Sequence, residues 1–208
     1  MPTLKTITES ILRRLKDEDA QYLDKIALKK RIKAQIKELY PYVVIKATET
    51  TNFPTTSPYI VSLPSAREVI EVWLLDSNDK EVRQIYDFSF DKETRKLHFS
   101  SAPAFTWNLG ITTGSKIKIV YAKDPTIASL EDDEEINIDS AATDLLELSV
   151  IRSLIEEELN SRATRPAYPK VFPALSPAAL TGLLNYYTYK IRERKSEIGE
   201  LNKVYIIK

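Results

Sequence analysis

Cysteine is absent from this chain of 208 residues, and glycine (four residues) and histidine (one) are rare. Without cysteine the chain has no disulfides, no thiolate nucleophile and no cysteine-ligated metal cluster. Nucleotide-binding loops of the Rossmann and P-loop kinds need a cluster of glycines, and Gly110, Gly114, Gly182 and Gly199 form neither pattern. His98 has no second His or Cys nearby with which to bind a transition metal or activate a nucleophile. We therefore expect a protein that is not an enzyme and needs no cofactor or metal.

Long apolar runs and an excess of charge of either sign are also missing. No run approaches the roughly 20 apolar residues that cross a bilayer, and the start of the chain lacks the apolar stretch of a secretion signal. The 30 Lys and Arg residues balance the 30 Asp and Glu residues, so any attraction to nucleic acid must be local. With 43% hydrophobic and 29% charged residues, the composition is that of a folded domain. We expect folding in the cytoplasm and no membrane association.

Residues 1–41 are predicted to form a helical hairpin. Apolar residues recur there at steps of three and four, as on one face of an α-helix. The first series is Leu4, Ile7, Ile11, Leu12 and Leu15, and the second is Leu28, Ile32, Ile36 and Leu39. A polar break from Asp17 to Asp19 separates the two series, and Pro41 disfavours helix at the residue before it.

Residues 42–122 are predicted to form an antiparallel β module. Compact apolar runs at 59–63 and 69–75 have the length of strands, and turn residues follow the second run. Two further stretches alternate between apolar and polar residues, which indicates one buried and one solvated face. The residues expected on the buried face are Tyr86, Phe88, Phe90, Ile117, Ile119 and Tyr121. A sheet or a small sandwich fits this pattern.

The rest of the chain is predicted to be an acidic connector, 123–140, and two helices within 141–203. Apolar residues cover more than half of the first helix's circumference, so we expect this helix to be central to the core. They are Leu145, Leu146, Leu148, Ile151, Leu154, Ile155 and Leu159. Ser140 can cap this helix, and Ser176-Pro177 is a favoured start for the last one. The predicted class is α+β, with a helical bundle formed by the N- and C-terminal helices and an inserted antiparallel β module.

Two charged features are candidate contact sites. Lys25, Lys29, Lys33 and Lys37 are spaced by four, which places them along one face of the second predicted helix. This face can contact a nucleic-acid backbone or an acidic partner, or it is simply the solvent side of the helix. The acidic run Glu131, Asp132, Asp133, Glu134 and Glu135 lacks the glycine-containing alternation of an EF-hand loop. It therefore reads as a solvated connector or a docking strip for a basic neighbour.

The last residues of the chain form an apolar tail, 204–208, with strong strand preference. These residues are Val204, Tyr205, Ile206, Ile207 and Lys208. An exposed strand-forming segment aggregates unless something pairs with it. The tail is expected either to add a strand to a partner's sheet or to fold back on the chain's own sheet.

The order of helical hairpin, β module, acidic link and apolar helix resembles the head–tail connector (adaptor, or neck) proteins of tailed bacteriophages. Three stretches of the sequence carry the likeness. The first is Ile11-Leu-Arg-Arg-Leu-Lys-Asp running into Tyr22-Leu-Asp. The second is Ile60-Val-Ser-Leu-Pro followed by Arg67-Glu-Val-Ile-Glu-Val-Trp-Leu-Leu-Asp. The third is Ile117-Lys-Ile-Val-Tyr-Ala-Lys-Asp-Pro, then Leu130-Glu-Asp-Asp-Glu-Glu and an Ala-rich helix from Ala141.

The resemblance implies a structural virion protein that forms a homo-oligomeric ring, typically a dodecamer, beneath the portal. Such a ring continues the DNA channel toward the tail and contacts the portal and the tail or a second neck protein. In that setting the lysine face can line the lumen, touch DNA non-specifically or meet a neighbour's acidic strip, and the tail can reach an adjoining ring.

Two other classes of function stay open. A baseplate or surface protein can bind a carbohydrate or a protein through aromatic residues of its β module. Trp73 lies in the apolar run 69–75, where core packing is favoured, and Trp107 lies in a predicted loop. The interpretation as a hydrolase or transferase is supported only by acidic residues that form no motif.

Overall fold

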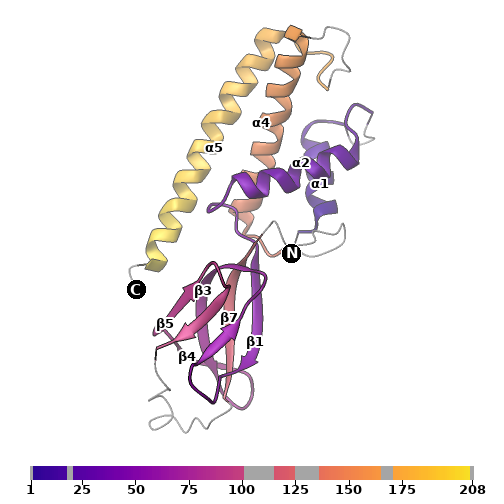
Figure 1. Cartoon of the computed structure of the whole chain (residues 1–208). Helices are drawn as coiled ribbons and strands as arrows, with labels where there is room; N and C mark the ends of the chain where they lie inside the picture. Colours follow the sequence, from indigo (N-terminus) through magenta and orange to yellow (C-terminus); the bar gives the residue numbers. More distant parts are fainter. Residues whose placement is uncertain (1, 18–20, 101–114, 125–135, 165–170, 207–208) are drawn as a thin grey trace. The chain divides into compact units, whose positions relative to one another are not determined.

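The computed structural model describes residues 2–17, 21–100, 115–124, 136–164 and 171–206, with the side chains of 200–206 left aside. The chain divides into two compact units (Figure 1). A helical unit contains Met1–Val44 and Leu130–Lys208, and a β unit contains Ile45–Ser129. The sequence predicts that the β module begins after residue 41 and ends at residue 122, a few residues before each boundary of the β unit. The α+β class is confirmed.

The first two helices begin at side chains that cap them. Helix α1 (Leu4–Arg14) starts after Thr3, whose hydroxyl accepts the Thr6 N–H at 3.1 Å while the Thr6 hydroxyl accepts the Thr3 N–H at 2.7 Å. Helix α2 (Lys25–Glu38) starts after Asp24, whose carboxylate accepts the Ile26 N–H at 3.0 Å. Between them, the carboxylate of Asp17 accepts backbone N–H groups of the following turn, so the predicted polar break shapes the connection. Both predicted helices are confirmed.

Helix α4 (Ser140–Thr164) lies at the centre of the helical unit, as its wide apolar surface predicts. It contacts α1, α2 and α5. Residues all around its axis are buried, among them Leu145, Leu146, Val150, Ile151, Leu154 and Ile155. Ser140 is the first helical residue rather than the cap. Figure 1 shows α2 lying across α4 while α5 runs alongside it, and the bundle arrangement of the helices stays a prediction.

Helix α5 (Pro177–Ile206) starts as predicted and ends later than predicted. The Ser176 hydroxyl accepts the Ala179 N–H at 3.2 Å, and Pro177 is the first helical residue. The helix then continues through Val204, Tyr205 and Ile206, so the expectation of a strand-forming tail is wrong for these residues. No proline or glycine follows Gly199, and extending an existing helix adds one hydrogen bond per residue without a new nucleation cost. Ile207 and Lys208 lie outside the described residues.

The β unit contains two antiparallel sheets. One sheet has the order β1-β7-β3-β4, with β1 at Lys46–Asn52, β7 at Lys116–Lys123, β3 at Ala66–Leu75 and β4 at Glu81–Gln84. The other has the order β2-β6-β5, with β2 at Ile60–Ser62, β6 at Lys96–Phe99 and β5 at Phe88–Asp91. Residues of both sheets share one core. It includes Val61, Leu63, Val72, Leu74, Leu97, Phe99, Ile117 and Ile119.

The predicted buried face of the β unit is correct except at two aromatic residues. Ile117, Ile119 and Tyr121 are buried, and Phe88 and Phe90 pack against the core. Tyr86 is 72% exposed because it precedes β5 and its alternation with Phe88 and Phe90 is not continued by a strand. Trp73 is only half-buried and lies on the opposite face of β3 from Val72 and Leu74, so the expectation of core packing is wrong.

Replacing Ile151 by Ala is expected to lower the free energy of unfolding of the helical unit by about 2–5 kcal/mol. Ile151 is fully buried in α4, so its shortening leaves a cavity that neighbouring side chains fill only in part. Ile26→Ala is the matched control, since Ile26 is 64% exposed and its loss should cost about 0.5 kcal/mol or less. Urea unfolding followed by circular dichroism measures both, and equal losses would contradict the central position of α4.

Candidate assembly surfaces

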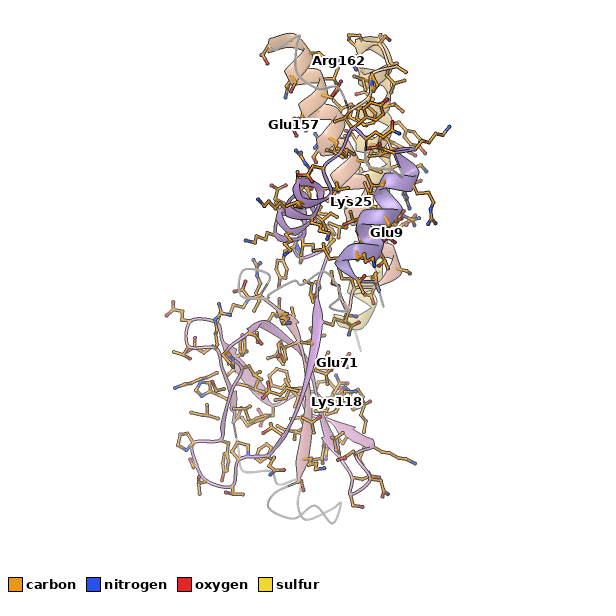
Figure 2. The ribbon with its side chains drawn as sticks, turned by 90° about the vertical axis from the view of Figure 1, so that its right-hand side faces the viewer. Glu9, Lys25, Glu71, Lys118, Glu157 and Arg162 are labelled. Atoms are coloured by element: carbon orange, nitrogen blue, oxygen red, sulfur yellow. The ribbon has the colours of Figure 1, made fainter. Side chains whose placement is uncertain are left out.

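The lysine face of α2 is narrower in the structure than the sequence predicts. Lys25 and Lys37 are exposed, whereas Lys29 and Lys33 are half-buried beside the stripe of Leu28, Ile32 and Ile36. Figure 2 marks Lys25 at the start of the helix. Lys25 and Lys37 lie in the first and last turns of the helix, and Lys29 and Lys33 lie in its middle, so only the ends of the series reach solvent fully.

The opposite flank of α2 carries a cation that is used inside the helical unit. Arg31 donates to the Ser153 hydroxyl at 3.3 Å and forms an ion pair with Glu157, both on α4. Figure 2 marks Glu157. These contacts fix α2 against α4. Of the cations of this helix, the exposed Lys25 and Lys37 are therefore better placed to meet an outside anion than Arg31.

The acidic run Glu131, Asp132, Asp133, Glu134 and Glu135 lies outside the described residues, and so does Trp107. Its role as a docking strip stays a prediction. The role of Val204, Tyr205, Ile206, Ile207 and Lys208 as a partner contact also stays a prediction, although a helix replaces the expected strand as far as Ile206.

A charged junction joins three helices at the N-terminal part of α4. The Asp144 carboxylate accepts from Arg14 Nη2 of α1 at 2.8 Å and from Arg194 Nε of α5 at 2.8 Å. Arg14 Nε also lies 2.9 Å from Glu147 Oε2, although that oxygen accepts no hydrogen bond from the described residues. Residues from distant parts of the sequence therefore meet at one carboxylate, and no local pattern in the sequence points to this.

The two carboxylates of the junction have pKa values shifted in opposite directions. Burial raises the pKa of Glu147 and outweighs the opposing effects of Ser10 and Arg14. Burial also acts to raise the pKa of Asp144, but the hydrogen bonds from Arg14 and Arg194 outweigh it, so the pKa is lowered. Asp144 thus stabilises the junction as an anion, whereas burial makes ionisation of Glu147 less favourable than in water.

Asp144→Asn is expected to lower the free energy of unfolding by about 2 kcal/mol near neutral pH, because two charge-assisted hydrogen bonds weaken. The lowered pKa of Asp144 means that its contribution is present above the ordinary pKa of an aspartate and is lost as the pH falls through the folded value. The difference between the variant and the native chain should therefore shrink at acid pH. Chemical unfolding across a pH series measures it.

Glu147→Gln is the contrasting variant at the same junction. The raised pKa of Glu147 means that the native chain loses stability as the pH rises from the ordinary glutamate value through the folded value. A neutral amide removes this loss, so the variant should match or exceed the native free energy of unfolding at neutral pH. A loss as large as that of Asp144→Asn would show that Glu147 acts as a paired anion instead.

A second buried carboxylate organises the approach to α5. Glu158, 3% exposed, accepts from Arg162 Nε at 2.7 Å and from the Val171 N–H at 2.9 Å. Arg162, marked in Figure 2, also donates to the carbonyl oxygens of Phe172, at 2.5 Å, and Leu175. This pair is internal to the helical unit and stabilises the segment before α5.

An aromatic surface on α5 was not predicted. Tyr186 and Tyr189 are 53% and 62% exposed and lie three residues apart, hence on one face of the helix. Tyr187 packs edge to face against Tyr186 at 5.4 Å between centroids, and burial raises its pKa. A run of three tyrosines within four positions is the signal in the sequence, but the periodicity of the neighbouring leucines does not say which of them face solvent.

The outer face of the four-stranded sheet combines aromatic and polar side chains around Trp73. The indole Nε1 donates to Glu71 Oε2 at 2.8 Å, and Trp73 lies opposite Gln84 on β4 and Lys118 on β7. The Tyr86 hydroxyl donates to Gln84 Oε1 at 2.7 Å. Glu71 and Lys118 are marked in Figure 2. We call this group, Glu71, Trp73, Gln84, Tyr86 and Lys118, the Trp73 face.

Neither a protein-family model nor a curated protein sequence matches this chain. Within the described ranges, no group of three or more His, Cys, Asp or Glu side chains is arranged to hold a metal ion. No helix in the same ranges has both the length and the apolar character needed to span a bilayer.

Proposed function

We propose that this chain is a non-enzymatic structural protein of a tailed-phage virion, a head–tail connector that forms a ring between the portal and the tail. The observation that carries the proposal is the arrangement of the chain itself: helices from both ends share one compact unit, and an antiparallel β unit is inserted between them. The resemblance of the sequence to connector proteins rests on the same order of helical hairpin, β module and apolar helix. Fold alone does not establish function, so the exposed surfaces matter.

Exposed apolar and aromatic side chains on both units support an assembly role. Tyr186 and Tyr189 lie together on α5. Val82, 49% exposed, lies on β4 at the edge of its sheet, and Tyr86, 72% exposed, follows that strand. Side chains of this kind are enriched where protein surfaces bind each other. In a connector the subunit contacts are the function, and the portal, the tail or a second neck protein covers the remaining faces.

The decisive experiment is the mass of the purified protein by light scattering, alone and mixed with a candidate portal ring. The proposal predicts either a closed ring of many 23.8 kDa chains or stoichiometric capture of the chain by the portal. Electron microscopy distinguishes rings from irregular aggregates. A monomer that stays unbound at high concentration would overturn the proposal.

Reversing the charge of the exposed lysines of α2 tests their contact with DNA. Lys25→Glu with Lys37→Glu should weaken binding of the assembled protein to non-specific duplex DNA and reduce the dependence of that binding on salt, because phosphate contacts release counterions. Lys5→Glu with Lys92→Glu changes the net charge equally at exposed positions elsewhere and is the control. Equal DNA binding by both variants would show that the lysine face does not contact the DNA in the channel.

A binding module is the second candidate, and the Trp73 face favours it. An exposed tyrosine beside a half-buried tryptophan, with carboxylate, amide and ammonium groups around them, has the composition of a carbohydrate or protein contact. The same light-scattering experiment separates the candidates. An unbound monomer that binds a glycan array, and loses that binding in Trp73→Ala, would favour the binding module over the connector.

A further inference from the structure

The two edges of the four-stranded sheet differ in length and regularity. Within the described part of the chain, β1 pairs with β7 alone and β4 pairs with β3 alone. The pairing of β1 is regular along all seven residues, and the pairing of β4 shifts register between Leu74 and Leu75 of its partner. Regular pairing continues past this shift at residues 83–85, since the Ile85 N–H donates to the Val72 carbonyl at 2.8 Å. Both edges thus offer backbone groups to another strand.

The directions of the strands allow one copy of the sheet to continue into the next. Each neighbouring pair in the order β1-β7-β3-β4 is antiparallel, so β1 and β4 run in opposite directions. A second copy related by rotation about an axis along the strands keeps its strand directions. Its β1 therefore arrives antiparallel to β4 of the first copy. Such head-to-tail contacts close into rings, as a connector requires.

We propose that β1 of one copy pairs with residues 83–85 of the next copy, with Glu49 opposite Arg83. This inference rests on the proposed function in requiring that copies of the chain assemble. Arg83 lies opposite the buried Leu74, and Glu49 lies opposite the buried Ile119, so both belong to the core-facing side of the sheet. Opposite charges directly across an antiparallel pair stabilise it.

The neighbouring positions fit the same register. Gln84 then lies opposite Thr48, and Ile85 lies opposite Ala47. Gln84 shares the outer face with Trp73, and Thr48 pairs with Val120 on that outer face. Ile85 is buried, and Ala47 packs against the core. A shift by one residue would turn every side chain to the wrong face, and a shift by two places Glu49 opposite either Ile85 or a residue outside 83–85.

The backbone hydrogen bonds agree with this register. Phe53 N–H donates to Ser115 and Ile45 accepts from Lys123, so the odd-numbered residues of β1 direct their backbone groups to β7. Thr48 therefore directs its N–H and C=O to the free edge. Ile85 is bonded to β3, so Gln84 directs its own groups to the other edge. Thr48 and Gln84 form the hydrogen-bonded pair, and Glu49 and Arg83 form the adjacent closely spaced pair.

Cysteine cross-linking tests the register. The chain has no cysteine of its own, so every disulfide must involve an introduced residue. Closely spaced antiparallel positions are within reach of a disulfide. The variant with Glu49→Cys and Arg83→Cys in one chain is expected to give a ladder of linked copies on mild oxidation, seen on a non-reducing gel. Glu49→Cys with Ser89→Cys, an exposed position on β5, is the control and should give no ladder.

Charge exchange gives an independent reading of the same contact. Arg83→Glu alone and Glu49→Arg alone should each reduce the assembled mass measured by light scattering, and the two together should restore it. Thermal unfolding of each variant separates loss of assembly from loss of the fold.

Three outcomes would overturn the proposal. An oligomer that forms no Glu49–Arg83 ladder and ignores the charge exchange would reject this interface and leave the connector function standing. A chain that stays monomeric with the portal and forms no ladder would reject both. A control ladder as strong as the test ladder would show that the cross-links come from random collisions between chains and not from the proposed strand pairing.

Discussion

The structure of the helical unit depends on covering α4. This helix buries residues around most of its circumference, and each fully buried aliphatic side chain stabilises the fold by roughly 1.5–3 kcal/mol. One neighbouring helix cannot cover such a surface. Helices α1 and α2 from the start of the chain and α5 from its end therefore meet on α4, and the β unit is left as an insertion between them.

Carboxylates that enter this crowded unit follow the same constraint. Asp144 is retained as an anion because Arg14 and Arg194 reach it from two other helices. Glu147 is more deeply buried, one of its oxygens accepts no hydrogen bond from the part of the chain that the structure describes, and its pKa is raised. Glu158 is buried but satisfied by Arg162 and a backbone N–H. Burial costs free energy for each charge, and the partners that offset it decide whether the charge persists.

The β unit has its own core, and the open edges of its sheets connect it to the proposed function. The two sheets cover each other's inner faces through the shared core, but in the described part of the chain the edge strands of the four-stranded sheet each pair on one side only. A ring of copies would use edges β1 and β4 as joints, and the tyrosines of α5 and the Trp73 face would remain for other contacts. Assembly in this form needs no new fold, since the strands keep the directions that they already have in one copy.

Local patterns in the sequence by themselves determined the α+β class, the helix start at Ser176, and the burial of Ile117 and Ile119, because periodicity and capping act between residues close in the chain. They misplaced Trp73 and Tyr86, since apolar composition does not say which face of a strand meets the core. They also favoured a strand at 204–206, where the preceding helix continues. The Asp144 junction, the half-burial of Lys29 and Lys33, and the placement of Glu49 and Arg83 on the core-facing side at opposite edges of one sheet were decided only by tertiary structure. Each depends on residues from separate elements, and only packing brings such residues together or sets them at opposite edges of one sheet.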